Sequence, residues 1–132
     1  MPLKLRLRGG ERLALNGAMI RNTGTGTAQI EVLGAAALLQ DRDIMAPEQV
    51  HSALDNLYYH VQLLHLERAD PQSRRRSLQA VCTAILAAAD ADKDVETSSI
   101  VAEVDRQVEA GDTIGALRRI QLKIGKPSAG RH

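Results

Sequence analysis

The alternation of side chains near the start of the chain constrains the fold more than any other stretch. One set is apolar, Leu3, Leu5 and Leu7, and the other is basic, Lys4, Arg6 and Arg8. Because successive side chains of a strand point to opposite faces, this pattern predicts a half-buried strand with a basic outer face.

Four further short strands are expected before residue 46. Gly9-Gly10 predicts a turn, after which residues 12–15 run back. Asn16-Gly17 predicts a type I′ hairpin turn, since both central residues of that turn need a positive φ. The remaining strands are expected at residues 18–22, 28–33 and 35–40, with a glycine-rich hairpin loop at residues 23–27.

The rest of the chain shows helical periodicity. Pro47 suits the first position of a helix and Glu48 suits its positive end, so we expect a helix over residues 47–67. Three more are expected at residues 73–89, 95–110 and 113–124, with Gly111 ending one and Asp112 capping the next. The sequence thus predicts an α+β protein, with a small antiparallel β unit (residues 1–45) and a helical bundle (residues 46–132).

Composition limits the classes of function. With 2% aromatic residues and no Phe or Trp, the core must be built from aliphatic side chains. A net charge of +1 argues against a general coat for nucleic acid, so an anion-binding surface should be local. Cys82 is the single cysteine, which excludes an intrachain disulfide. No signal-peptide pattern or membrane-length apolar run is present, and we expect a cytoplasmic protein without membrane contact.

Catalytic and metal-binding patterns are weak. No two of His51, His60 and His65 lie three or four residues apart, so they do not share a helix face as metal ligands would. The glycines of residues 23–27 lack the lysine and the following helix of a phosphate-binding loop. We therefore expect no metal, no cofactor and no enzymatic activity.

Basic residues are better candidates for a binding site. Lys4, Arg6 and Arg8 would stand about 7 Å apart along one face, a spacing similar to that of phosphates along a single RNA strand. The alternative is an ordinary solvated outer face. The run Arg74-Arg75-Arg76 opposes the dipole of the helix it opens, which leaves two readings, a tolerated placement or an anion site.

Several segments resemble the flagellin-synthesis repressor family FlbT. They include Met1-Pro2-Leu3-Lys4-Leu5, Gly10-Glu11-Arg12-Leu13, Asn16-Gly17-Ala18, Ile20-Arg21-Asn22, Arg42-Asp43-Ile44-Met45-x-Pro47-Glu48, Tyr58 to Leu66, and Ala110-Gly111 with Ala116-Leu117. One departure is Ala46, where the family often has a Thr or Ser that would cap a helix. We expect its loss to fray that helix start by about 1 kcal/mol.

This resemblance implies a small regulator of bacterial flagellum biogenesis. Such proteins act after transcription, at the 5′ untranslated region of flagellin mRNA, and usually promote its decay. Some members instead activate flagellin production.

The order of the predicted strands is also similar to the small β fold of the carbon storage regulator CsrA. That family binds mRNA leaders as a dimer, through arginines of its first and last strands. Arg6 or Arg8 and Arg42 hold roughly equivalent positions, although the first strand is one residue longer and the Arg42 block one residue shorter. The likeness implies RNA contacts by Arg6 or Arg8 and by Arg42, without aromatic stacking, and allows a homodimer. Together with the basic face of residues 4–8, it gives Lys4, Arg6, Arg8 and Arg42 as the candidate RNA-binding residues.

Two functions from different classes are consistent with the sequence. The first is a repressor that binds the flagellin mRNA leader, which the basic face of residues 4–8 favours. The alternative is a protein-binding adaptor or chaperone whose helices engage flagellin or another flagellar regulatory protein, which the near-neutral charge favours.

Overall fold

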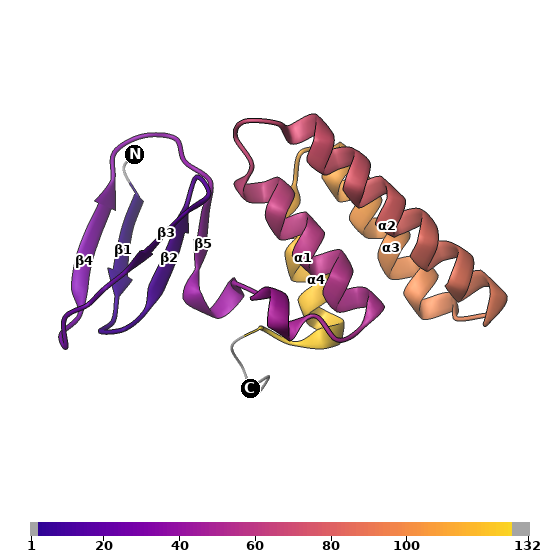
Figure 1. The fold of residues 1–132 in the computed structure, drawn as a ribbon, viewed down its shortest axis with the longest axis horizontal. Helices are drawn as coiled ribbons and strands as arrows, with labels where there is room; N and C mark the ends of the chain where they lie inside the picture. The colour runs from indigo at the N-terminus through magenta and orange to yellow at the C-terminus, as the bar shows by residue number, and fades with distance from the viewer. Residues whose placement is uncertain (1–2, 128–132) are drawn as a thin grey trace.

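The computed structural model describes residues 3–127, with strands at one end of the molecule and helices at the other (Figure 1). The strands are β1 (Leu3–Leu7), β2 (Arg12–Leu15), β3 (Ala18–Arg21), β4 (Ala28–Val32) and β5 (Leu38–Gln40). Two 3-10 turns follow, η1 (Asp41–Asp43) and η2 (Pro47–Gln49). The helices are α1 (Ala53–Leu66), α2 (Pro71–Ala91), α3 (Val95–Glu109) and α4 (Thr113–Ile124). The α+β architecture predicted from the sequence is confirmed.

The strands form two separate antiparallel sheets. β1 pairs with β4, with Leu5 opposite Ile30, and β2 lies between β3 and β5 in the second sheet. The Gly9-Gly10 turn therefore carries the chain from one sheet into the other. Residues 23–27 also cross between the sheets, so the expectation of a hairpin loop there is wrong.

Asn22 explains this crossing. Its side-chain amide donates to the carbonyl oxygens of Leu7 (2.8 Å) and Gly26 (2.9 Å), and its side-chain oxygen accepts from the N–H of Gly24 (3.0 Å). These bonds hold the loop against the end of β1. A Cβ at Gly9 would lie 2.6 Å from the carbonyl oxygen of Gly24, so this close approach requires glycine.

The Asn16-Gly17 turn has the predicted geometry. Asn16 has a φ of 52° and Gly17 a φ of 90°. The two-residue turn fixes the register of the hairpin, with Leu15 opposite Ala18 and Arg12 opposite Arg21.

Burial along the apolar face of β1 is graded. Leu7 is 6% exposed, Leu5 is half-buried and Leu3 is 47% exposed. The alternation predicted the two faces correctly. Burial fades toward the start of the strand, because a two-stranded ladder offers little cover.

The first helix begins later than predicted. Pro47 lies in η2, and α1 starts after Ser52, whose hydroxyl accepts from the N–H of Asp55 at 3.0 Å. The Asp55 carboxylate accepts in return from the N–H of Ser52 at 3.2 Å, which completes a capping box. The cost expected at Ala46 does not arise, since no α-helix starts there and the Ala46 N–H is bound by Gln49 Oε1.

The other three helices begin with aspartate caps. Asp70, Asp94 and Asp112 each accept from a backbone N–H three residues ahead. Gly111 has a φ of 81°, as its predicted role at the end of α3 requires. Neighbouring helices pack α1 on α2, α2 on α3, α3 on α4 and α4 back on α1, which closes a four-helix bundle.

One hydrophobic core joins the two ends of the molecule. It contains residues of β2 and β5 (Ala14, Leu39), the connection after η1 (Ile44, Met45) and the apolar stripes of all four helices. The inner side of the second sheet therefore packs on the helical bundle.

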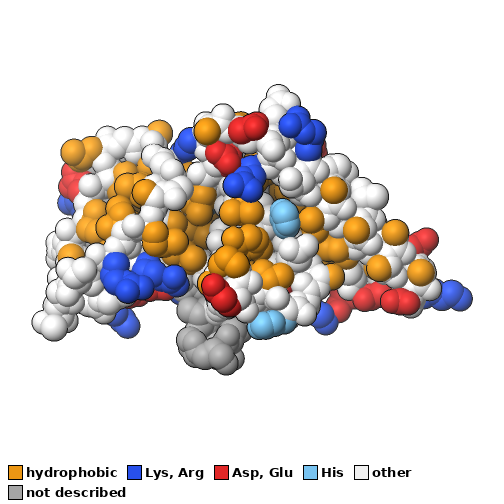
Figure 2. Space-filling model, viewed as in Figure 1, with side chains coloured by type: hydrophobic (Ala, Val, Ile, Leu, Met, Phe, Trp, Pro, Cys, Tyr) orange, Lys and Arg blue, Asp and Glu red, His pale blue; other side chains and the backbone are white. Residues whose placement is uncertain are grey.

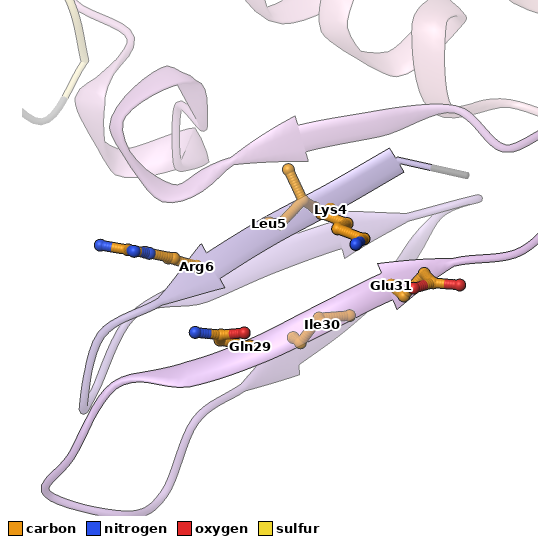
Figure 3. A pocket seen from close by; sticks show the side chains of 6 residues that line it. All are labelled: Lys4, Leu5, Arg6, Gln29, Ile30 and Glu31. Carbon is orange, nitrogen blue, oxygen red and sulfur yellow. The ribbon is translucent and has the colours of Figure 1, made fainter. Parts of the chain in front are cut away.

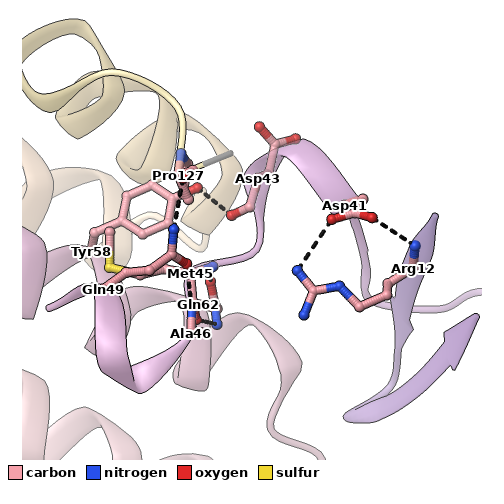
Figure 4. Close-up of polar contacts among 9 residues, drawn as sticks. All are labelled: Arg12, Asp41, Asp43, Met45, Ala46, Gln49, Tyr58, Gln62 and Pro127. Atoms are coloured by element: carbon pink, nitrogen blue, oxygen red, sulfur yellow. Dashed lines mark hydrogen bonds and ion pairs between the residues drawn. The ribbon is translucent and has the colours of Figure 1, made fainter. Parts of the chain in front are cut away.

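A buried polar cluster, here called the Asp43 network, fixes the connection between the two ends. Tyr58 Oη donates to the backbone oxygen of Asp43 at 2.6 Å (Figure 4). Gln121 Nε2 donates to Tyr58 Oη at 2.8 Å and to Asp43 Oδ1 at 3.0 Å. Arg118 Nη1 donates to the same carboxylate oxygen at 2.8 Å. Asp43 and Tyr58 are fully buried, so η1 is held against α1 and α4 by satisfied polar groups.

Two further contacts support this connection. Gln62 of α1 accepts from the N–H of Met45 (2.8 Å) and donates to its carbonyl oxygen (3.0 Å). His65 Nε2 lies 2.9 Å from the carbonyl oxygen of Leu38, and its Nδ1 lies 2.7 Å from Thr113 Oγ1. Because a carbonyl only accepts, Nε2 carries a proton, and His65 links β5 to α4.

Removing the β unit tests how far the helices form a unit of their own. We expect a fragment of residues 41–132 to unfold cooperatively. A fragment of residues 46–132 lacks the buried side chains Ile44 and Met45, and should be less stable by at least about 3 kcal/mol. Thermal denaturation followed by circular dichroism checks this, and equal stability of the two fragments would contradict it.

The Asp43 network predicts an alkaline loss of stability. Burial raises the pKa of Tyr58 above its ordinary value of 10.0, although the hydrogen bond from Gln121 acts in the opposite direction. The neutral phenol is favoured in the folded state, so its contribution is complete below pH 10 and is lost as the pH rises further. At about pH 8, Tyr58→Phe should lower the free energy of unfolding by about 1–2 kcal/mol.

The measurement is urea denaturation between about pH 8 and about pH 11. The parent should lose more stability across this range than Tyr58→Phe, while Tyr59→Phe, at a half-buried tyrosine, should follow the parent. Parallel pH curves for the parent and Tyr58→Phe would show that the Tyr58 phenol is not the titrating group.

Candidate nucleic-acid interface

The outer face of the first sheet carries two of the four predicted binding residues. Lys4 and Arg6 are both exposed and lie on the same side of β1, with Glu31 and Gln29 of β4 directly opposite them. Figure 3 shows these side chains around a groove of about 500 Å³ that Leu5 and Ile30 also line. Lys4 thus faces a carboxylate across the ladder, whereas Arg6 faces a neutral amide.

Arg8 lies beyond the end of β1, in the turn at Gly9-Gly10. Its backbone N–H donates to Glu11 Oε1 at 2.6 Å, and its carbonyl oxygen accepts from the Glu11 N–H at 3.0 Å. The Arg8 side chain is exposed. Backbone bonds from Gly10 to Asn22 and from Asn22 to Glu11 place the end of β3 beside this turn.

Arg42, the fourth predicted residue, belongs to the same end of the β unit. Asp41, its neighbour in η1, accepts from the backbone N–H of Arg12 at 2.8 Å and from its guanidinium at 3.2 Å. These bonds hold η1 at the start of β2 (Figure 4). The Arg42 side chain is exposed there.

The structure adds two arginines to this end. Arg12 and Arg21 are directly opposite one another in the β2–β3 hairpin, and Arg21 is exposed. Like charges in such a position are unfavourable. We use the name arginine end for Arg8, Arg12, Arg21 and Arg42. Figure 2 shows basic side chains gathered along the lower edge of the strand-bearing end.

The arginine end also contains carboxylates. Asp41 is bound to Arg12, and Glu11 accepts the backbone N–H of Arg8. Three of these arginines are exposed, and Arg6 lies on the adjacent strand. This end of the β unit can therefore attract a polyanion.

The position of Arg21 opposite Arg12 could have been predicted from the sequence. The Asn16-Gly17 turn sets a two-residue hairpin, and counting outward from it pairs Arg12 with Arg21. The alternation of residues 3–8, by contrast, placed Lys4 and Arg8 in one predicted binding face. In the structure Lys4 lies near the start of β1 and Arg8 just after its end, about 13 Å apart along the strand.

Two arginines of the run Arg74-Arg75-Arg76 in α2 have partners outside that helix. Arg74 Nε donates to Glu67 Oε1 at 3.0 Å, and this hydrogen bond lowers the pKa of Glu67. Arg75 donates to the carbonyl oxygen of Val108 near the end of α3, at 3.2 Å. Because Pro71 begins the helix, the run lies beyond the first turn, where opposition to the dipole is weaker. These contacts favour the tolerated placement over an anion site.

His60, His65 and Cys82 have structural surroundings. Burial lowers the pKa of His60, with Arg74 acting in the same direction, and burial raises the pKa of the Cys82 thiol to about 11. Within residues 3–127, no group of His, Cys, Asp or Glu is arranged to hold a metal ion. None of the described helices is long and apolar enough to cross a membrane.

Comparison with known proteins assigns the family. Residues 3–124 match the family model described as Flagellar protein FlbT. The chain belongs to the FlbT family. Curated relatives that match this chain carry the name flagellum biosynthesis repressor protein.

Two relatives show how far the similarity extends. The flagellum biosynthesis repressor protein FlbT of Caulobacter vibrioides is 37% identical over 67 residues, covering 51% of this chain and 47% of that protein. The probable FlbT repressor of Brucella ovis is 28% identical over 121 residues, covering 92% of this chain and 76% of that protein. The chain thus spans about half the length of the Caulobacter relative and about three quarters of the Brucella relative. No solved structure matches.

Two substitutions test the geometry of the arginine end. Arg12→Gln should lower the free energy of unfolding by about 0.5–1 kcal/mol, because it removes the ion pair with Asp41. Arg21→Gln should leave stability unchanged or raise it by up to about 0.5 kcal/mol, because it removes a like charge opposite Arg12. Urea denaturation measures both. A larger loss in Arg21→Gln than in Arg12→Gln would mean that Arg21 is a structural residue.

Proposed function

We propose that this FlbT-family protein is a repressor of flagellin synthesis that binds the 5′ untranslated region of flagellin mRNA and promotes its decay. The observation that carries the proposal is the arginine end, where four arginines from separate segments of the chain lie at one end of the β unit and three of them are exposed. The printed names of the relatives, flagellum biosynthesis repressors, support the physiological role.

The chemistry of the β unit suits the backbone of a single-stranded RNA. Residues 3–45 contain no aromatic side chain, so bases cannot stack there on Phe, Tyr or Trp. One arginine guanidinium can bind two oxygens of a phosphate at once, and it can also stack on a base. Arg6, Arg8 and Arg42, together with Arg21, would supply these contacts, while Lys4 would contribute less because Glu31 faces it.

This role would be carried out in the cytoplasm, where mRNA is translated. A protein held on the leader would compete with the ribosome for it. An mRNA that is not translated is open to cellular nucleases, which connects binding to decay without requiring a catalytic group in this chain.

A salt titration tests the proposal. The affinity for a flagellin leader RNA should fall with salt, with a log–log slope of about −0.7 per phosphate contact. Three or four contacts would give a slope of roughly −2 to −3. The double variant Arg6→Ala/Arg42→Ala should flatten the slope by about one unit.

The matched control is Arg76→Ala/Arg106→Ala, which removes two exposed arginines from α2 and α3. Its slope should equal that of the parent, and thermal denaturation should show that both double variants remain folded. The absence of RNA binding at about 50 mM salt, or equal slopes for the two double variants, would refute the proposed RNA site.

A further inference from the structure

The outer face of α4 exposes an apolar side chain that the proposed RNA site does not use. α4 buries Ala116, Leu117 and Ile120 in the core of the bundle. On the opposite face Leu122 is 81% exposed, and Gly115 lies two turns before it.

Leu122 lines a groove with a volume of about 620 Å³, whose surface is mainly apolar. Gly115 and Gly125 also line it, and a Cβ at Gly125 would meet no other atom within 4 Å, so the space beside Gly125 is open. The groove therefore combines an apolar surface with room for side chains from outside.

All charged residues that line the groove are basic. They are Arg118, Arg119 and Lys126. Arg118 is paired with Asp43 and Arg119 with Glu103, and neither carboxylate lines the groove. Among the described residues, no carboxylate lies within ion-pair distance of Lys126. The groove thus presents an apolar centre with a positive rim.

We propose that this groove is a docking site for an acidic amphipathic helix of a partner protein. An amphipathic helix laid in a groove places apolar side chains at every third or fourth position against the groove's apolar surface. Carboxylates on its flanks would meet Arg118, Arg119 and Lys126, and such complementarity selects the partner.

The same charges argue against two other occupants. A second copy of this chain would bring the same basic rim against itself, and like charges at an interface suppress association. An RNA strand would place its phosphates beside the exposed Leu122, which offers them no hydrogen bond. The proposal therefore commits to an acidic protein segment, and it does not depend on RNA binding at the arginine end.

The experiment uses the full chain and three synthetic peptides of about 16 residues, labelled for fluorescence anisotropy. One carries leucines on one helical face and glutamates elsewhere. The second has the same composition in scrambled order, and the third replaces each glutamate with lysine. The acidic amphipathic peptide should bind at least about tenfold more tightly than either of the others. Equal binding by the scrambled peptide would overturn the proposal, since charge alone would then explain the interaction.

Variants locate the site. Leu122→Ala should weaken binding of the acidic amphipathic peptide about fivefold or more, and Lys126→Glu should weaken it and reduce its salt dependence. The matched control is Leu33→Ala, because Leu33 is 82% exposed but lies after β4. Its affinity should stay within about twofold of the parent. An equal loss in Leu33→Ala, or no loss in Leu122→Ala, would overturn the assignment to α4.

Self-association is measured on the same samples by sedimentation velocity. A monomer, or a dimer that Leu122→Ala does not disturb, agrees with an acidic partner as the occupant. A dimer that dissociates in Leu122→Ala would overturn it in favour of a second copy.

Discussion

The buried carboxylate of Asp43 is the interaction on which the arrangement of the molecule depends. It lies where the strands give way to the helices, and it accepts hydrogen bonds from Arg118 and Gln121 at the other end of the sequence. A buried carboxylate is costly unless its acceptors are filled, so the chain can place Asp43 here only when α4 is in position. The position of Asp43 in the connection between strands and helices consequently depends on α4.

The two aspartates of η1, Asp41 and Asp43, bind different halves of the molecule. Asp41 binds Arg12 at the start of β2, while Asp43 binds the helical bundle. Arg42, between them, is left on the surface. The sequence resembles FlbT in the segment Arg42-Asp43-Ile44-Met45. The role of this segment is largely structural, since its acid and its two apolar residues are all buried.

Features set by neighbouring residues could be predicted, and features set by distant ones could not. The bounds of α3 and α4 follow from local signals, such as the aspartate caps and the left-handed Gly111. Alternation identified the faces of β1 correctly, but it carries no information about which strand lies alongside, so the pairing with β4 was not foreseen. For α1, Pro47-Glu48 led to a predicted start that is too early. The helix starts after the capping box at Ser52.

The candidate site shows the same limit. The exposed positions of Lys4 and Arg6 followed from alternation, and the contact of η1 with β2 that places Arg42 depends on the distant pair Arg12–Asp41. Arg21 could have been predicted from the register of the hairpin, which is a local feature. That prediction would have required counting residues outward from the turn and noticing that both members of the pair are basic.

The opposed guanidinium groups of Arg12 and Arg21 would couple the stability of the β2–β3 hairpin to any anion that binds beside them. Their mutual repulsion is a small free-energy cost that any multivalent anion at this end would relieve, whether polynucleotide, polyphosphate or a phosphorylated surface. By thermodynamic linkage, a ligand that binds the folded state preferentially also stabilises it. Occupancy of the arginine end and the stability of the hairpin should thus rise together.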